Sequence, residues 1–462
     1  MNARKLLRQL ENIIPADRIL VRDRIPPKYR FDALRPYRAY PRLRKKGYAP
    51  AVLVRPESAD EVSKIVGIAR RSRTPVTPYG GGTGLMGAAV AIRGGIMIDT
   101  SRMNRIEEIS RENMLVHAQA GVILEDLYTH LDASHLLFAH DPWTRPIANL
   151  GGGIGTNSLG YLGAKYGSIG SQLLGVEAVM HDGQLLKTRP AQFSSTGFDL
   201  KRLFLGTEGM FGIITSAVVR AFPKPERFSL AAYNFPTFKQ GYRAILTMRT
   251  SDVRPSMIDF GEEDPNENRE AQLNLAFDGL NSEVEAHIGK ADQIANRFNG
   301  QRQGDQHARE FWDHRHDIAL MYLRRISKPL PSEEPRTKFD YIHVSLPASK
   351  ILEFREEVLR IAKSGGAKVR EVGLWHGPEL FSIALSCRAA NPSTATRKMW
   401  RTSNTILRLA QDLGGSMEFC HGVGLKLAHL MQREHGFGFE IMRQLKRALD
   451  PLGLMNPSKA GL

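Results

Sequence analysis

Two glycine-rich segments constrain the fold of this chain more than any other feature of its sequence. The first reads Gly80-Gly-Gly-Thr-Gly84, and the second reads Asn149-Leu-Gly-Gly-Gly-Ile-Gly-Thr-Asn157. Glycine adopts positive φ without strain and lets a backbone approach a ligand closely, and successive N–H groups in such a turn bind anions. The first segment matches neither the GxGxxG fingerprint nor a Walker loop. Two backbone cradles predict one long ligand with a diphosphate and a flat ring system; structural turns between short strands are the alternative.

Length and cysteine content narrow the class of protein. A chain of 462 residues exceeds one ordinary core, so we expect two or three domains. No apolar run approaches about 18 residues, which argues against a membrane-spanning helix, and the N-terminus lacks the apolar core of a signal peptide. Only Cys387 and Cys420 are present, which excludes a disulfide framework and a four-cysteine iron–sulfur cluster. We therefore expect a cytoplasmic protein, and an iron–sulfur carrier, if electrons leave through one, must be another polypeptide.

The positive charge is concentrated near the N-terminus. The formal net charge is +16, and residues 1–50 hold 14 Lys and Arg against 4 acidic residues. A solvated basic arm over residues 1–47 is the simplest interpretation. Docking on anionic lipid at the inner face of a membrane, or on an acidic partner, is the alternative. Nucleic-acid binding is not favoured, because no aromatic-rich recognition motif accompanies the charge.

The pattern of apolar residues predicts an α+β chain. Ser58 begins a capping box, which predicts a helix to about Arg71. The proline-containing stretch 223–227 interrupts the pattern, and strands alternate with helices beyond it. Residues 300–336 are polar and contain proline, which suggests a long insertion or lid. We expect four parts, at residues 1–47, 48–225, 226–410 and 411–462.

Several motifs in the same order resemble one known family. They are Pro78-Tyr-Gly-Gly-Gly-Thr-Gly-Leu85, Gly151-Gly-Gly-Ile-Gly-Thr-Asn157, Lys165-Tyr-Gly167, His181-Asp-Gly183, Gly206-Thr-Glu-Gly-Met-Phe-Gly212, His421-Gly-Val-Gly424 and Asp450-Pro with Asn456-Pro-Ser-Lys459. They resemble the PCMH-type FAD domain of the vanillyl-alcohol oxidase superfamily, in the branch with the FAD-binding subunit of glycolate oxidase, D-lactate dehydrogenase and alkyl-dihydroxyacetonephosphate synthase. The resemblance is strong over residues 48–222, good over 411–462 and weak between.

The resemblance implies a two-subdomain FAD-binding fold, an antiparallel-sheet substrate (cap) domain, and a C-terminal segment that returns to the flavin. It implies noncovalent FAD, because members with a covalent flavin have histidine where this chain has Thr83. By carry-over, residues 80–84 hold the diphosphate, Glu208 lies near the adenosine end, and Asn456 reaches the flavin. The full set of implied cofactor residues is Pro78, Gly80, Gly81, Gly82, Thr83, Gly84, Leu85, Asp141, Pro142, Gly152, Gly153, Gly155, Thr156, Asn157, Lys165, Tyr166, Gly167, Glu208, Gly212, Ile214 and Asn456.

The metal ligands of the hydroxy-acid branch are replaced in this chain. In that branch an arginine and a divalent metal hold the substrate, and a histidine takes the hydroxyl proton. The three ligand positions correspond here to Leu374, Phe381 and Cys420, so we expect no metal. Since His376, Glu379 and Glu418 lie nearby in the sequence, a site rebuilt from them is the alternative.

Three residues are candidates for the chemistry. His421 is the first candidate base, because imidazole titrates near neutrality and its motif matches the family; His376 is the second. Arg315 could clamp a carboxylate or phosphate. The alternatives are structural histidines and an exposed helix arginine. Lys426 and Lys459 are either anion contacts or surface lysines.

The leading hypothesis is an FAD-linked oxidase or dehydrogenase that takes a hydride from a small-molecule substrate, a glycolate- or D-lactate-type hydroxy acid or a related alcohol. The second hypothesis is an alkyl-dihydroxyacetonephosphate-synthase-like enzyme without net redox. The third is an FAD-binding subunit whose chemistry needs a partner, such as an electron-acceptor protein or an iron–sulfur subunit.

Overall fold

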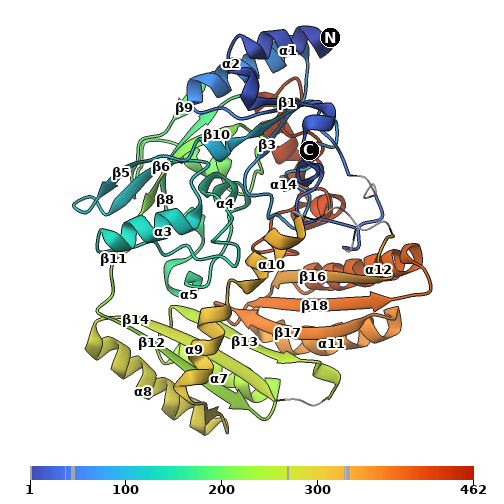
Figure 1. Ribbon diagram of the computed structural model, residues 1–462. Coiled ribbons are helices and arrows are strands. Elements are labelled where there is room, and N and C mark those ends of the chain that lie inside the picture. Colours follow the sequence, from blue (N-terminus) through green and yellow to red (C-terminus); the bar gives the residue numbers. More distant parts are fainter. Residues whose placement is uncertain (1–2, 37, 43–46, 268–269, 327, 329–332) are drawn as a thin grey trace.

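The structure is a computed structural model that describes residues 3–36, 38–42, 47–267, 270–326, 328 and 333–462. Figure 1 shows two lobes, one above the other. The N-terminal lobe extends to Pro223, the second lobe runs from Arg227 to Asp412, and the C-terminal segment, residues 413–462, returns to the N-terminal lobe.

A small parallel sheet carries the first glycine-rich segment. Its strands, in spatial order, are β1 (Ile19–Val21), β2 (Val52–Val54), β4 (Ile96–Asp99) and β3 (Val76–Tyr79), with β1 antiparallel to β2 and the others parallel. Helix α2 (Ala59–Ser72) begins where predicted, because the Ser58 hydroxyl accepts the N–H of Glu61 at 3.2 Å. Its apolar face packs into the same core as the strands. The glycine-rich segment directly follows β3.

An antiparallel sheet forms the other half of the N-terminal lobe. Its strands, in spatial order, are β5 (Ile106–Ser110), β6 (Leu115–Gln119), β10 (Ile213–Arg220), β8 (Leu173–Val179) and β9 (Leu185–Lys187). Helices α3 (Leu124–Ala133), α4 (Leu150–Thr156) and α6 (Ile169–Gln172) contribute to its core, and α5 (Gly163–Tyr166) lies nearby in the chain. The short strands β7 (Leu136–Leu137) and β11 (Phe222–Pro223) pair beside it.

The second lobe is built on one seven-stranded antiparallel sheet. Its spatial order is β15 (Gln301–Arg302), β12 (Arg227–Phe235), β14 (Ala271–Gly279), β13 (Met257–Glu263), β17 (Lys368–Trp375), β18 (Leu380–Arg388) and β16 (Thr337–Ser345). Helices α7 (Phe238–Thr250), α8 (Asn281–Arg297), α11 (Ile351–Gly365) and α12 (Pro392–Asp412) share one hydrophobic core with it. Met257, on the opposite face from the core residue Phe260, instead packs with Tyr161 of the N-terminal lobe. That face therefore meets the N-terminal lobe.

The polar stretch 300–336, predicted as an insertion or lid, contains two helices in its described part. It forms α9 (Asp305–His314) and α10 (Asp317–Ile326), and Figure 1 places α10 between the lobes. The inward positions Ala308 and Ala319 are buried, which explains why a polar sequence still packs. The Tyr322 hydroxyl donates to the carbonyl of Gly82 at 2.7 Å, so α10 contacts the glycine-rich segment.

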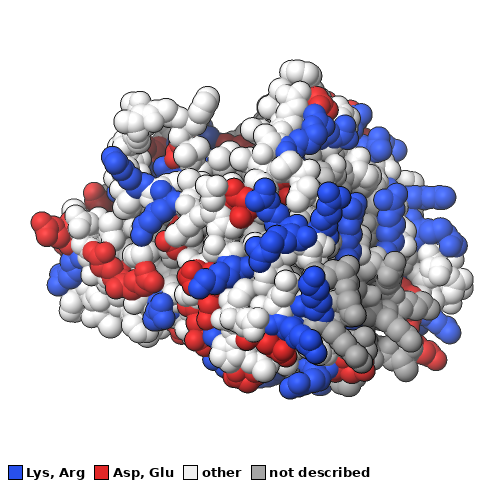
Figure 2. All heavy atoms as spheres, turned by 90° about the horizontal axis from the view of Figure 1, so that it is seen from above, with Lys and Arg blue, Asp and Glu red and all other residues white. Residues whose placement is uncertain are grey.

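The N-terminal basic segment is not the solvated arm that the charge suggested. Helix α1 (Ala3–Glu11) buries Leu6 and Leu10 in the core of the parallel sheet. Further along the segment, the Arg38 side chain is fully buried. The Arg38 backbone forms an isolated parallel β-bridge with Phe339 on β16, the edge strand of the second lobe. Other basic side chains do reach the surface, and Figure 2 shows Lys and Arg gathered over the middle and right of the upper face. The segment thus ties the two lobes together.

The C-terminal segment completes the N-terminal lobe. It contains α13 (Met431–His435) and α14 (Phe437–Leu449) and then adds to the free edge of β3. Val76 donates its N–H to the carbonyl of Leu454 at 2.8 Å, and Asn456 donates to that of Val76 at 2.7 Å. None of the helices that the structure describes combines the length and apolarity needed to cross a bilayer.

Candidate functional site

The two glycine-rich segments lie against each other. A Cβ on Gly80 would come within 2.4 Å of the Asn149 side-chain oxygen, and one on Gly81 within 2.3 Å of the Ile147 carbonyl. A Cβ does not approach a backbone carbonyl that closely, so residue 81 must be glycine, and a side chain at residue 80 would displace the Asn149 amide. The arrangement brings together the two segments predicted to bind one ligand.

The second segment, predicted as a backbone cradle with structural turns as the alternative, is mostly helical. Residues 150–156 form the short helix α4, and the Asn149 side chain caps it by accepting the N–H of Gly152 at 2.9 Å. A Cβ on Gly151 would lie 2.8 Å from that of Ala120. Glycine is therefore needed here for close helix packing as well as for ligand access. Gly153 and Gly155 are buried in this helix, Gly152 is exposed, and Thr156 and Asn157 are half-buried at its end.

The first segment presents unused backbone donors. Within the described part of the chain, the N–H groups of residues 81–85 donate no hydrogen bond to the protein. Gly81, Thr83, Gly84 and Leu85 are half-buried rather than sealed. Buried or half-buried N–H groups are normally paired, and a run of free ones is an anion-binding nest. This observation fits the diphosphate of a dinucleotide.

Three further segments converge on the same place. The Glu208 carboxylate accepts N–H groups from Val423 at 2.8 Å and Gly424 at 3.0 Å. The Asn456 amide donates to the carbonyls of Ala88 at 2.9 Å and Glu208 at 2.6 Å. Burial raises the pKa of Glu208 to about 7. These contacts hold the His421 loop beside the glycine-rich segment.

Asn456 also retains a free acceptor. Its side-chain oxygen is buried and, among the described residues, has no hydrogen-bond partner. A buried unpaired acceptor is costly, so the oxygen fits a ligand N–H. Pro78 packs against Gly209, where a Cβ would lie 2.3 Å from its ring. Gly212 is buried directly before β10, and Ile214 belongs to the buried start of that strand.

Lys165 and Tyr166 contact the second lobe. The Lys165 ammonium lies 2.9 Å from a carboxylate oxygen of Asp278 on β14, and the Tyr166 hydroxyl donates to the other oxygen at 2.6 Å. Gly167, with φ of 71°, ends their short helix. The Lys165-Tyr-Gly167 motif therefore connects the two lobes next to α4.

Arg315 is paired rather than free. Its Nε lies 3.0 Å from the buried carboxylate of Asp141, which Arg145 and His316 also contact at 3.0 Å each. Burial would raise the pKa of Asp141, but these neighbours lower it to about 2. Pro142 is buried beside this cluster. The arginine predicted to clamp substrate is therefore engaged by Asp141.

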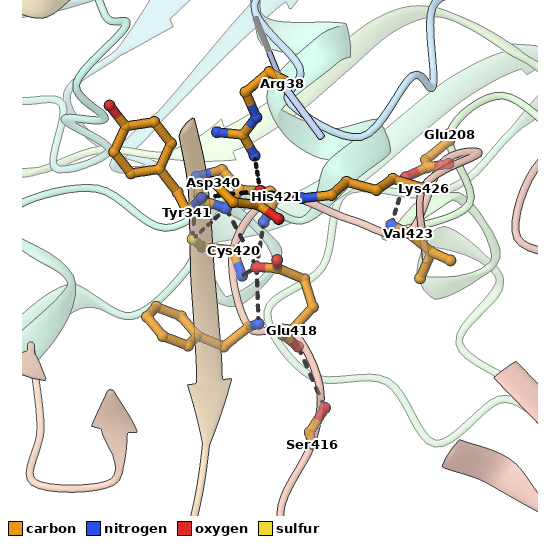
Figure 3. A network of polar contacts seen from close by, with 11 residues as sticks. Arg38, Glu208, Asp340, Tyr341, Ser416, Glu418, Cys420, His421, Val423 and Lys426 are labelled. Atoms are coloured by element: carbon orange, nitrogen blue, oxygen red, sulfur yellow. Dashed lines mark hydrogen bonds and ion pairs between the residues drawn. The ribbon is translucent and has the colours of Figure 1, made fainter. Parts of the chain in front are cut away.

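His421 lies in a compact polar cluster (Figure 3). The Glu418 carboxylate is 3.4 Å from its Nδ1 and accepts the N–H groups of Phe419, Cys420 and His421 at 3.1, 2.9 and 3.0 Å. The ring of His343, from β16, lies 4.4 Å from the His421 ring. Burial alone would raise the pKa of Glu418, yet His421 and the backbone donors lower it to about 2.

His376 lies apart from this cluster. It occupies the turn between β17 and β18 with φ of 63°, and burial lowers its pKa to about 3. Glu379 forms an ion pair with Arg249 instead. Leu374 and Phe381 pair across the two strands and are buried in the hydrophobic core. Of the residues that the sequence suggested for a rebuilt metal site, Glu379 pairs with Arg249 and Glu418 with His421, and the ring nitrogens of His376 have no hydrogen-bond partner among the described residues.

The structure adds Arg38 and His343, which sequence reasoning missed, and it buries Lys426, one of the lysines that the sequence left as anion contact or surface residue. Arg38 and Lys426 both contact the Asp340 carboxylate, and all three side chains are buried (Figure 3). Arg38 was one of many basic residues near the N-terminus, and His343 lies on a strand far from any motif. Neither position carries a local signal, because their partners are distant in the chain.

The chain matches known families over nearly its whole length. Residues 50–189 match the FAD binding domain, and residues 224–460 match the C-terminal domain of FAD linked oxidases. Glycolate oxidase subunit GlcD of Bacillus subtilis is 27% identical over 428 residues, which cover 89% of this chain and 88% of that protein. D-lactate dehydrogenase of Archaeoglobus fulgidus is 28% identical over 450 residues, covering 94% of this chain and 96% of that protein.

Solved structures share the fold. Alkyldihydroxyacetonephosphate synthase has a TM-score of 0.79 at 19% identity, covering 98% of this chain and 84% of that chain. p-Cresol methylhydroxylase also has a TM-score of 0.79, at 15% identity, covering 99% of this chain and 96% of that chain. The predicted α+β architecture of a PCMH-type enzyme is confirmed. The chain belongs to the FAD-linked oxidases and is an oxidoreductase with FAD as its cofactor.

Proposed function

We propose that this enzyme oxidises a small hydroxy acid of the glycolate or D-lactate type, or a related alcohol. The observation that carries the proposal is the His421–Glu418 pair, at 3.4 Å, on a loop bound to the glycine-rich segment through Glu208 and Met86. The named relatives glycolate oxidase and D-lactate dehydrogenase support this substrate class.

His421 takes the proton of the substrate hydroxyl. A carboxylate beside Nδ1 favours the tautomer with the proton on that nitrogen, which leaves the Nε2 lone pair available. Glu418 has this position, and three backbone N–H groups hold it there. FAD, when bound, supplies the acceptor for the hydride. His421 and Glu418 supply the base and its orientation.

Arg38 and Lys426 bind the acid group of the substrate. Their two positive charges share a single carboxylate, Asp340, which is fully buried. The Nε and Nη1 donors of Arg38 are buried and lack hydrogen-bond partners in the described residues. A buried guanidinium with unused donors favours an anion. Arg315, already paired with Asp141, instead positions the connection between α9 and α10.

The cofactor is bound without a covalent link from this loop, since Thr83 replaces histidine. Residues 81–85 offer their free N–H groups to the diphosphate, and the Asn456 oxygen accepts from the ring system. The residues around α4 and the 206–214 segment line the remainder of the site. His376, neutral because burial lowers its pKa to about 3, is the second candidate for contact with substrate.

Anaerobic flavin reduction tests the proposed reaction. Glycolate, D-lactate or a longer D-2-hydroxy acid should bleach the yellow enzyme. His421→Ala should slow this reduction by at least about a hundredfold, because general-base catalysis contributes that much or more. His435→Ala, on the exposed end of α13, is the matched control and should keep the wild-type rate. Bleaching by dithionite alone across the panel contradicts the proposal.

One observation favours a second candidate function. His343 lies 4.4 Å from His421, so two histidines meet where an alkyl-dihydroxyacetonephosphate-synthase-like enzyme is expected to cluster them. Substrate-dependent alkyl exchange without flavin bleaching would identify that chemistry. Bleaching by a hydroxy acid would exclude it as the main activity.

A separate acceptor takes the electrons from the reduced enzyme. Cys387 is buried in the second lobe and Cys420 lies in the polar cluster, so the chain's two cysteines lie apart. The basic upper face in Figure 2 fits an acidic acceptor protein, an iron–sulfur subunit, or an anionic membrane surface. Salt-sensitive reduction of an added acceptor tests this surface.

A further inference from the structure

Three potential metal ligands meet in the polar cluster. They are His343 from β16 and the consecutive residues Cys420 and His421, and one donor atom from each lies within 4.8 Å of the others. The Cys420 sulfur is 3.4 Å from Nδ1 and 3.6 Å from Nε2 of His421. Tetrahedral zinc has bonds of about 2.0–2.3 Å, which separate its ligand atoms by roughly 3.3–3.8 Å. A small movement of His343 would complete such a geometry.

The donor atoms are available for a cation. The His343 ring is 3% exposed, and its Nδ1 has no hydrogen-bond partner among the described residues. Cys420 and His421 are half-buried, so an ion can reach the cluster.

The Glu418 carboxylate is positioned to orient the His421 ring. It is 3.4 Å from Nδ1 of His421 and is held by the backbone of the same loop. Metal-binding histidines commonly donate their second ring N–H to such a carboxylate, which fixes the tautomer. With the proton held on Nδ1 by this contact, the lone pair on Nε2 stays free to bind a cation.

We propose that His343, Cys420 and His421 bind a thiophilic divalent cation, of which Zn²⁺ is the prototype. One sulfur and two imidazole donors suit zinc and cobalt and do not suit magnesium or calcium. Binding forms a metal–thiolate bond and releases the thiol proton to solvent. This site differs from the one that the family motif implies, because two of those positions, Leu374 and Phe381, are core residues.

Occupation of the site inhibits the enzyme. This consequence rests on the proposed function, since a cation on Nε2 of His421 uses the lone pair that accepts the substrate proton. Cation binding and proton abstraction are therefore competing uses of one atom. Flavin reduction by substrate should slow in proportion to the fraction of enzyme that holds the cation.

Cobalt titration of the FAD-loaded enzyme tests the site without substrate. Tetrahedral Co²⁺ absorbs at longer wavelength than oxidised flavin, so the added band reports binding directly. We expect one equivalent in the wild type and in Cys387→Ser, whose cysteine is buried elsewhere on β18. Cys420→Ser and His343→Ala should each bind at least about tenfold more weakly.

The results of these experiments distinguish the metal site from the role of His421 as the base. Absence of the band in the wild type, or unchanged binding in a folded, yellow Cys420→Ser variant, overturns the metal site. Cys420→Ala provides a second test if the serine variant does not fold. A cation that binds as expected while the rate of flavin reduction stays constant leaves the site intact and overturns His421 as the base.

Discussion

Each lobe has a buried aspartate that pairs with an arginine from outside that lobe. Asp141 in the N-terminal lobe contacts Arg315, from the connection between α9 and α10. Asp340 in the second lobe contacts Arg38, from the N-terminal segment. Both pairs join the lobes, and both aspartates are essentially inaccessible to solvent.

The two pairs differ in how completely the arginine is used. Arg315 donates to Asp141 and to the carbonyl of Trp312 at 2.6 Å, and its guanidinium lies 3.7 Å from the Trp312 ring centre. Arg38 leaves Nε and Nη1 without hydrogen-bond partners in the described chain, although its guanidinium lies over the Tyr341 ring. The first pair is complete as a structural contact, and the second has capacity left for a ligand.

The largest expected effect is the loss of stability in Asp141→Ala. Removal of this carboxylate leaves Arg315 buried without its counter-charge, while Arg145 keeps Glu125, and breaking such a buried pair typically costs about 3–5 kcal/mol of unfolding free energy. Urea unfolding measures the loss. Asp132→Ala is the matched control, since its ion pair with Lys224 is about half exposed and contributes less than about 1 kcal/mol. Equal effects of the two variants would contradict a structural role for Asp141.

Sequence reasoning succeeded where the signal is local. The cap at Ser58 predicted α2, and glycine runs identified the segments that meet near Asn149, because φ and close approach act within a few residues. It failed for residues 305–326, whose helices bury only a few small side chains and leave larger apolar ones of α10, such as Leu320 and Met321, exposed. Polar composition did not reveal that contact surface.

The residues of the candidate site likewise divide into those with a local sequence signal and those without one. His421 could be found from its glycine-flanked motif. His343 and Arg38 could not, because the features that make them important are contacts with residues far along the chain. Lys338 on β16 and the carbonyl of Pro36, for example, are 302 residues apart yet hydrogen-bonded. Such pairs depend on how the lobes pack, which a local pattern does not encode.

A change at Arg38 should weaken substrate binding, and Lys426 remains as a counter-charge to Asp340 in the folded protein. Arg38→Met keeps the length and packing of the side chain but removes the donors proposed for the acid group. The Michaelis constant for a hydroxy acid should rise roughly a hundredfold, since each hydrogen bond between charged groups contributes about 1.5–3 kcal/mol. Arg35→Met, in the same buried segment but outside the Asp340 contact, is the matched control. A Michaelis constant that changes equally in both variants would make the Asp340 pair structural, like that of Asp141.

The pH dependence of unfolding should show a smaller effect of the Asp141 charge. The pKa of Asp141 is lowered from its ordinary value near 3.8 to about 2, so its ionised form is stabilised in the folded state. That stabilisation is fully present above pH 3.8 and is lost as the pH falls toward about 2, because the unfolded chain then binds the proton first. The shift corresponds to about 2 kcal/mol. Unfolding free energies measured across this range should fall more steeply for the wild type than for Asp141→Asn, which has no proton to bind. Parallel curves would mean that the charge of Asp141 does not stabilise the junction between the lobes.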